Sequence, residues 1–326
     1  MGLPAVLAKR LRLPLIVAPM LAVSSPQLVI AACRAGVIGA FPTANCRSPA
    51  ELASWLDLFG ESLGPADAPW CANLVIRRAD LREHLALLCT HRVGLVITSV
   101  GSPQEVVGPL HDAGALVFAD VASLAHARKA VAAGVDGLVL LSAGSGGQTG
   151  SLNGLAFVRA VREFFEGPLV LAGGIGDGVA LWAAIALGCD LGYMGTRFIA
   201  SAESAASAAY KQMVVDCSMD DIVLTDAFTG LPTSMLLPSL RAAGVSPQEI
   251  TPAATRASAA AVFGSGSSAA APRRWRDLWS AGHSVSSAAA VLPAAELVAL
   301  TAAQFRAAAT ATCASPWSAP PCGEAS

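Results

Sequence analysis

The hydrophobic positions of this chain gather in eight short runs, and each run is followed by a turn and then by a segment with helical spacing. Nearly every residue within a run is apolar, which is typical of parallel strands buried on both faces. The runs cover residues 15–19, 37–41, 71–75, 95–99, 116–119, 137–141, 169–172 and 191–194. The pattern therefore predicts strands and helices in regular alternation.

The segments between the runs begin with residues that cap helices and mostly end with a glycine that leads into the next run. The predicted N-caps are Ser25, Ser48, Ser102, Ser123 and Asp177, of which Ser48 and Ser102 also open capping boxes. Gly188 suits the C′ position of the helix that Asp177 starts. Eight such units favour a closed barrel over an open sheet. The predicted fold is α/β, a (β/α)8 TIM barrel.

The alternation stops after residue 198, where a small helical and irregular insertion is expected near the C-terminal end. The elements expected there are a helix over 201–217, an edge strand over 220–226, an irregular stretch over 230–252, a linker at 264–268 and a last helix over 294–309. Trp275 and Trp279 have the i, i+4 spacing of one helix face. The chain is expected to divide into a barrel at 1–215, an insertion or lid at 216–274, C-terminal helices packing back on the barrel at 275–312, and a disordered tail at 313–326.

Composition narrows the class of protein. Hydrophobic residues make up 54% of the 326 positions and charged residues only 13%, so a large core can form. The net charge of −2 argues against nucleic acid or an acidic membrane as a partner. No apolar run reaches the length of a membrane span, and the eight cysteines lack metal-binding spacing. We expect a soluble cytoplasmic protein with free thiols, among them buried Cys33, Cys71, Cys89 and Cys189, and no metal.

Two glycine turns follow the last two predicted strands. Gly173, Gly174 and Gly176 follow the seventh strand, and Gly195 with Thr196 follows the eighth. Glycines let a ligand approach the backbone closely, and exposed amides at such turns attract anions, most often phosphates. Barrels commonly bind phosphate with the loops after these two strands.

The remaining strand ends supply the other candidates, because active sites of such barrels lie at the carboxyl ends of the strands. These positions include Ala18-Pro19-Met20, Asn73, Asp120 and the glycine-rich loop 144–150 with Gln148. Few of them are ionisable. That composition suits a bound cofactor that supplies its own chemistry.

Five of these segments, in this order, resemble the nitronate monooxygenase family, formerly called 2-nitropropane dioxygenases, whose members are FMN-dependent TIM barrels. The segments are Ala18-Pro19-Met20, Ala72-Asn73-Leu74, the loop 144–150, the turn 172–175 and the stretch 193–198. The likeness spans residues 13–240. A single glycine turn would be a weak match, whereas the ordered set is specific.

The resemblance implies roles for individual residues. Pro19 and Met20 would lie along the isoalloxazine ring, with the Met20 amide near the flavin N5, and Asn73 would offer its amide to the ring or substrate. Gly146 would approach the flavin from the sixth loop. The phosphate would be held by Gly173, Gly174, Gly195 and Thr196. The full set of expected FMN-binding residues is Ala18, Pro19, Met20, Asn73, Gly146, Gly147, Gly173, Gly174, Tyr193, Met194, Gly195 and Thr196.

The chain departs from the family pattern at two positions. Gln148 stands where many members have a histidine that is the proposed catalytic base, and Leu141 stands where a glutamine often contacts the flavin. A glutamine amide forms hydrogen bonds but accepts no proton near neutral pH. A nitronate is already the carbon anion and needs no base, whereas a neutral nitroalkane does. We therefore expect O2-dependent oxidation of nitronates and little activity on neutral nitroalkanes, unless Asp120 serves as the base.

Alternatives remain for both function and residues. The chain could be an NAD(P)H-dependent flavin reductase of the same superfamily that acts on a quinone or an enoyl thioester, or a redox-inactive barrel that binds a phosphate ligand. Asp120 could merely cap a turn, and Gln148 could serve packing alone. The sequence leaves open a monomer or a homodimer.

The histidines other than His283 are expected at surfaces or helix ends rather than in catalysis; they are His84, His91, His111 and His126. His283 is a further candidate for approaching the site, with a structural role as the alternative. No histidine falls at a predicted strand end.

Overall fold

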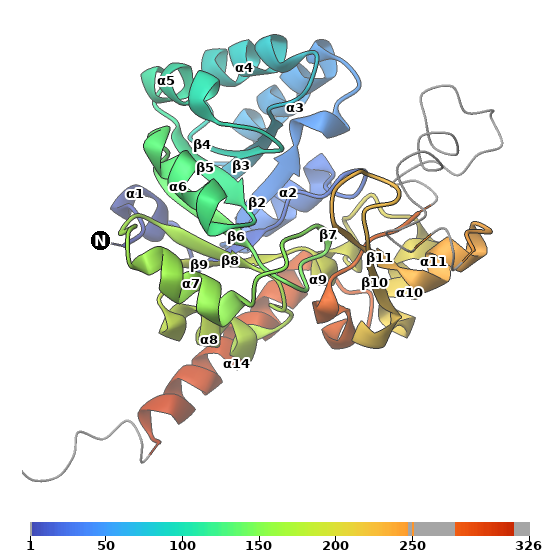
Figure 1. Ribbon diagram of the computed structural model, residues 1–326. Helices are drawn as coiled ribbons and strands as arrows, with labels where there is room; N and C mark the ends of the chain where they lie inside the picture. Colours follow the sequence, from blue (N-terminus) through green and yellow to red (C-terminus); the bar gives the residue numbers. More distant parts are fainter. Residues whose placement is uncertain (1, 247–249, 251–277, 316–326) are drawn as a thin grey trace, which may run out of the picture.

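Eight parallel strands close into a barrel in the computed structural model, which describes residues 2–246, 250 and 278–315 (Figure 1). The strands are β1 (Leu15–Val17), β2 (Ile38–Pro42), β3 (Trp70–Val75), β4 (Leu95–Ser99), β5 (Leu116–Val121), β6 (Gly137–Leu141), β8 (Leu169–Ala172) and β9 (Leu191–Met194). Each pairs with the next along the chain, and β1 closes the barrel on β9 with Leu15 opposite Gly192. The predicted (β/α)8 fold is confirmed.

Helices alternate with these strands and cover the outside of the barrel (Figure 1). Those of the barrel are α1 (Ala5–Ala8), α2 (Pro26–Arg34), α3 (Pro49–Ser62), α4 (Leu81–Thr90), α5 (Gln104–Asp112), α6 (Leu124–Ala132), α7 (Gly154–Arg162), α8 (Gly178–Leu187) and α9 (Thr196–Ile199). Later come α10 (Ala208–Asp216), α11 (Leu237–Ala242) and α14 (Ala294–Cys313), and the 3-10 turns are η1 (Thr43–Asn45), η2 (Met219–Asp221) and η4 (His283–Ser287).

Most of the predicted caps are present. Ser25 Oγ accepts a hydrogen bond from the Leu28 N–H at 3.1 Å, Asp177 Oδ1 accepts one from the Ala180 N–H at 2.8 Å, and Ser48 and Ser123 act in the same way. Gly188 adopts φ 113° as the C-terminal cap of α8. The predicted capping box at Ser102 is wrong, because Pro103 already has helical dihedrals and α5 starts at Gln104.

The core has two layers that follow from the alternation of side chains along each strand. One set points into the barrel and includes Ile16, Cys71, Phe118, Val139 and Leu191, all completely buried. The other set packs against the helices. A strand of uniformly apolar residues therefore fills both layers, which explains why the runs do not alternate in polarity.

Beyond the barrel the structure corrects two predictions. The helix expected over 201–217 starts only at Ala208, because Ser201 and Ser204 donate their hydroxyls to the Phe198 and Ile199 carbonyls and hold the preceding chain in a turn. The stretch 230–252 is not wholly irregular, since it contains α11 and a strand, β11 (Thr233–Leu236).

β11 lies at the centre of a small antiparallel sheet. The expected edge strand is present as β10 (Ile222–Thr225), and the third strand is β7 (Gly147–Gln148) from the glycine-rich loop after β6. The order β10-β11-β7 ties the insertion to that loop (Figure 1).

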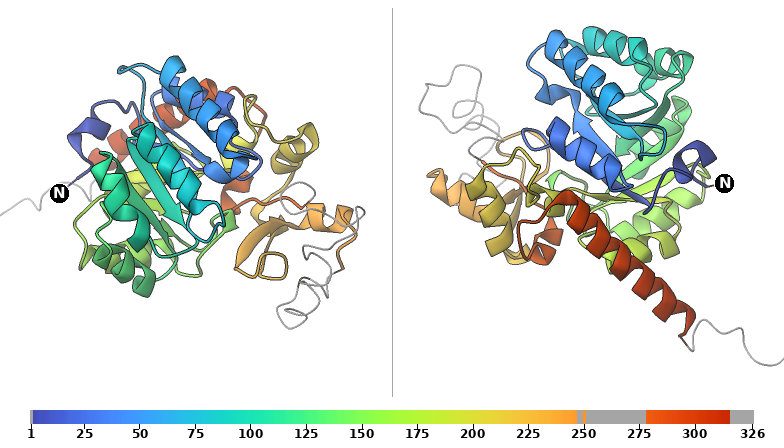
Figure 2. Two further views of the ribbon diagram at one scale, coloured as in Figure 1. Left: turned by 90° about the horizontal axis from the view of Figure 1, so that it is seen from above. Right: turned by 180° about the vertical axis from the view of Figure 1, so that it is seen from behind.

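The C-terminal segment returns to the barrel. Trp279 is not helical; it stacks on Tyr210 with ring centroids 5.0 Å apart and planes 12° from parallel. The last helix, α14, packs along α8, and its C-terminal end projects away from the body (Figure 2). Trp275, the linker at 264–268 and the tail after residue 315 lie outside the described residues.

The seven cysteines in the described residues are all free thiols, as expected, although Cys89 is only half-buried. Among the same residues, no helix has both the length and the apolar character needed to cross a membrane.

Candidate active site

A cavity of about 960 Å³ opens at the carboxyl ends of the barrel strands. Its walls come from the loops after the strands, from Leu231 and Pro232 beside β11, and from Ser280, Ala281 and Ser284 of the returning C-terminal segment. This volume lies at the upper end of the range for ligand pockets, so it has room for a cofactor and a small substrate together.

The floor of the cavity consists of the uppermost inward-facing residue of each strand. Each strand has a side chain in the buried interior layer, and the residue two positions further along that strand faces the cavity. These floor residues are Ala18, Pro42, Asn73, Ser99, Asp120, Leu141, Ala172 and Tyr193. Four of them are polar, on a layer that is otherwise apolar.

The four polar floor residues fall into two groups. Asn73 is 6% exposed; its amide donates to the Ile97 carbonyl at 3.2 Å and accepts from the Ser99 hydroxyl at 3.2 Å. Asp120 Oδ1 and the Tyr193 hydroxyl are buried, and neither has a hydrogen-bond partner among the described residues. Such groups are costly to bury unpaired, so they point to a ligand.

Burial also changes the ionisation of this second group. It raises the pKa of Asp120 to about 7, and it raises the pKa of Tyr193 well above 10, with the Asp120 charge as a second cause. Asp120 can therefore hold or release a proton near neutral pH.

The two glycine turns meet on one side of the cavity. Gly173 has φ 112°, and a Cβ there would lie 2.5 Å from Ser142 Oγ, so only glycine fits. Gly174 has φ 73° and faces open space. The backbone N–H groups of Gly174, Gly195 and Thr196 donate to no acceptor in the described part of the chain. These donors fit a phosphate group without any lysine.

The glycine-rich loop is fixed from two sides. A Cβ on Gly146 would lie 2.8 Å from the Gly282 nitrogen, so this glycine permits close packing of two backbone segments. Gln148 pairs with Thr233 in the small sheet, and the Thr149 N–H donates to the Pro232 carbonyl at 3.0 Å. Gly146, Gly147 and Gln148 all line the cavity.

The loop after β1 is held by an asparagine that the sequence analysis missed. Asn45 accepts from the Ala22 N–H at 2.9 Å and donates to the Met20 and Ser24 carbonyls at 3.1 and 2.9 Å. Pro19 and Met20 line the cavity, while the Met20 N–H donates to Ser24 Oγ at 2.9 Å. An amide so engaged has no second hydrogen for a ligand. The residue spacing along the sequence does not reveal this role of Asn45, because its hydrogen-bond partners are all backbone groups.

Met194 differs from the other predicted binding residues. Its side chain is fully buried in the layer between barrel and helices, and it does not line the cavity. Its carbonyl instead accepts from the Ala18 N–H at 3.0 Å. Thr196 Oγ1 accepts from the Gly282 N–H at 2.9 Å, yet the residue still faces the cavity.

The structure adds a basic rim that the sequence analysis did not predict. Arg77 after β3, and His126 and Lys129 on one face of α6, line the cavity, and none has an ion-pair partner within the described residues. His126 was expected to lie away from the strand ends; it is exposed, but the first turn of α6 brings it to the mouth.

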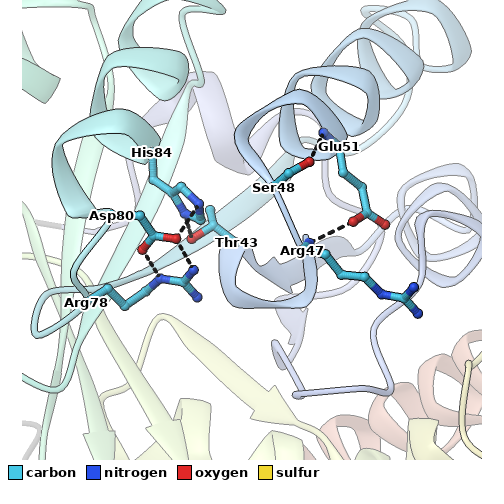
Figure 3. A network of polar contacts seen from close by, with 7 residues as sticks. All are labelled: Thr43, Arg47, Ser48, Glu51, Arg78, Asp80 and His84. Carbon is cyan, nitrogen blue, oxygen red and sulfur yellow. Dashed lines mark hydrogen bonds and ion pairs between the residues drawn. The ribbon is translucent and has the colours of Figure 1, made fainter.

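Two other histidines also had expected positions: His84 at a surface or a helix end, and His283 near the site. His84 is completely buried: its Nδ1 lies 2.9 Å from Thr43 Oγ1 and its Nε2 lies 3.4 Å from Asp80 Oδ2, which also binds Arg78 (Figure 3). Burial lowers the pKa of His84, and the Arg78 hydrogen bonds lower that of Asp80 to about 2. His283 is exposed and packs against Gly144, outside the cavity lining. This position favours the structural role that was the alternative for His283.

The residues present fit a flavin nucleotide. The unpaired amides of the glycine turns suit a phosphate, and the two unpaired floor groups suit a planar polar ring that would cover them. The described residues contain no cluster of histidine, cysteine or acidic side chains that could bind a metal.

Comparison with known proteins identifies the family. The sequence model of the nitronate monooxygenase family matches residues 64–300. The (3aS,4S,5R,7aS)-5-hydroxy-7a-methyl-1-oxo-octahydro-1H-indene-4-carboxyl-CoA dehydrogenase of Mycobacterium tuberculosis is 28% identical over 217 residues, which cover 66% of this chain but only 60% of the relative. A nitronate monooxygenase of Paraburkholderia phytofirmans is 27% identical over 284 residues, 74% of this chain and 78% of the relative.

The fold comparison agrees. The structure of FabK from Thermotoga maritima superposes with a TM-score of 0.81 and 25% identity, covering 94% of this chain and 96% of that one. The matched family segment spans most of the barrel, including the two glycine turns and Gln148. The chain belongs to the nitronate monooxygenase family.

Proposed function

We propose that this protein binds FMN and oxidises alkyl nitronates with O2. The observation that carries the proposal is the cavity itself: unpaired amides lie on one side of it, and a neutral amide, Gln148, stands at the loop where a base would be required for neutral nitroalkanes. FMN, when bound, accepts electrons from the substrate and passes them to O2.

The glycine turns would hold the FMN phosphate. Gly174, Gly195 and Thr196 line the cavity with backbone N–H groups that have no acceptor in the described residues, and the Thr196 hydroxyl can donate its own hydrogen while it accepts from Gly282. Pro19, Met20 and the floor residues would lie against the ring. Asn45 would act as a positioning residue, because it fixes the loop that carries Met20.

Gln148 would orient the substrate. Its side-chain amide can donate two hydrogen bonds, which suits the two oxygens of a nitronate, and the pairing with Thr233 holds the backbone in place. Arg77 and Lys129 of the basic rim give the cavity mouth a positive charge that attracts an anion. Both features favour the nitronate over the neutral nitroalkane.

Oxygen uptake with the two forms of one nitroalkane tests the proposal. FMN-loaded enzyme should consume O2 with a preformed nitronate at least tenfold faster than with the neutral form, assayed before the two equilibrate. Equal rates would show that a base operates in the site, and Asp120 is the carboxylate that lines it. No uptake with either form would contradict the proposal.

A thioester-directed oxidoreductase is the second candidate. The M. tuberculosis relative carries the name of a carboxyl-CoA dehydrogenase, and the basic rim also suits a phosphorylated carrier. Anaerobic NAD(P)H consumption with an enoyl thioester or a quinone, absent with nitronates, would favour this reading. A redox-inactive barrel has less support, since the chain belongs to a family of oxidoreductases.

A further inference from the structure

Two buried polar groups on the cavity floor have no partner in the protein. Asp120 lies at the end of β5 and Tyr193 at the end of β9, and both line the cavity. Asp120 Oδ1 and the Tyr193 hydroxyl form no hydrogen bond with each other or with any described residue. The other two polar floor residues, Asn73 and Ser99, bond to one another.

We propose that neutral Asp120 and Tyr193 form a donor pair that hydrogen-bonds the acceptor atoms on the polar edge of the flavin ring. The inference rests on the proposed binding of FMN. Asp120 would then contact the cofactor rather than the substrate. The protonation state of the Asp120 carboxyl would therefore influence the affinity for FMN.

The position of Tyr193 connects the pair to the flavin. Tyr193 precedes Gly195 by two residues, about 7 Å along an extended strand. The same cavity is lined by Gly174, Gly195 and the floor residues, so a nucleotide whose phosphate is bound by the glycine amides would have its ring within reach of the floor. A flavin ring offers carbonyl oxygens and a ring nitrogen along one edge, which are acceptors that need donors. A neutral carboxylic acid in an apolar site donates well.

Gln148 lines the cavity from a different part of the fold. It belongs to the sheet β10-β11-β7, whereas Asp120 and Tyr193 belong to the barrel. A substrate bound by Gln148 would therefore be held by the glycine-rich loop rather than by the floor residues. This division leaves the floor pair for the cofactor.

The environment of Asp120 supports a neutral carboxyl at moderate pH. Burial raises its pKa to about 7. Two other ionisable groups interact electrostatically with Asp120, namely Tyr193 on β9 and Cys71 on β3. Burial raises the pKa of each well above its usual value, so both stay neutral between pH 6 and 8. The rim residues Arg77, His126 and Lys129 line the same cavity at its mouth.

The two tyrosines of the chain offer a matched test. Tyr210 also lines the cavity and is also buried, but its hydroxyl donates to the Ser280 carbonyl and accepts from the Ser280 N–H at 3.2 Å. Tyr193→Phe removes a donor that has no partner in the protein. It should weaken FMN binding about tenfold and leave the urea midpoint of the apoprotein unchanged or higher. Tyr210→Phe should do the reverse, lowering the midpoint with FMN affinity changed less than twofold.

The pH dependence of FMN binding tests Asp120. The FMN dissociation constant of the wild-type apoprotein, measured by quenching of flavin fluorescence, should rise about tenfold more between pH 6 and pH 8 than that of Asp120→Asn, because the amide keeps a donor at both values. Any change shared by both proteins comes from the FMN phosphate or the basic rim. Asp120→Ala should bind weakly at both pH values.

Three results would overturn the inference: equal pH profiles for wild type and Asp120→Asn, equal loss of FMN affinity in the two tyrosine variants, or no FMN binding by the wild type. The last would also contradict the proposed function. Bound FMN without nitronate oxidation would contradict the proposed substrate alone and leave the floor pair in place.

Discussion

Gln148 of the glycine-rich loop faces Thr233 of the insertion as paired residues of one antiparallel sheet. The backbone of Gln148 is thus held by a segment 85 positions further along the chain. Thr233 is itself fixed, since its hydroxyl donates to the Leu231 carbonyl at 2.8 Å. The proposed orientation of the substrate by Gln148 would therefore depend on the fold of the insertion.

Gln148→His should introduce a base at this position. A histidine titrates near pH 6.5, so we expect oxidation of neutral nitroalkanes to rise at least tenfold and to follow a new ionisation between pH 6 and 7. Nitronate oxidation should change far less. Oxygen uptake across pH 5–9 measures both. Gln148→Asn, which adds no base, is the control, and an identical gain in that variant would refute the explanation.

Gly174→Ala should weaken FMN binding at least tenfold. The φ of 73° is strained for alanine, and the new Cβ would occupy the open space where the phosphate is proposed to bind. Gly114, with φ 88° and equally open surroundings, follows α5 at the opposite end of the barrel. Gly114→Ala should cost a similar stability, about 1–2 kcal/mol, with unchanged FMN affinity. Equal affinities in the two variants would place the phosphate elsewhere.

Asp120→Asn should stabilise the apoprotein at pH 8 but not at pH 4. The pKa of Asp120 is about 7 in the folded state against 3.8 for an ordinary aspartate, so the folded protein retains a proton that the unfolded chain releases. Its contribution to stability is therefore complete at low pH and is lost as the pH rises toward 7. The expected gain at pH 8 is on the order of a few kcal/mol, measured by urea unfolding. A gain that is the same at pH 4 would exclude this cause.

Asn45→Ala should disturb the site through the loop after β1. It removes hydrogen bonds to Ala22, Met20 and Ser24, which should lower stability by about 1–3 kcal/mol and weaken FMN binding several-fold. Asn153→Ala is the control: it removes the N-cap of α7, costs about 1 kcal/mol and leaves the cavity lining intact. A loss of FMN affinity as large in the control would indicate a global effect.

The sequence by itself determined the barrel. Apolar runs of strand length, serine and aspartate caps, and glycines at helix ends act over a few residues, so they fix each strand and helix locally. Strand ends then follow, and with them most of the cavity lining, including Pro19, Asn73, Gly174 and Gln148. The predicted helix over 201–217 failed for a local reason too, since serine hydroxyls bonded to the backbone and competed with helix formation.

Only the tertiary structure decided which polar groups are paired. Asn73 and Asp120 both lie near the carboxyl ends of their strands. Asn73 is bonded to Ser99, whereas Asp120 Oδ1 has no partner in the described residues, because the neighbours of the two strands differ. The same holds for the β7–β11 pairing, the bonds of Asn45 and the basic rim, all of which join residues far apart in sequence. Burial likewise sets the ionisation of Asp120, and burial is a property of the closed barrel rather than of any segment.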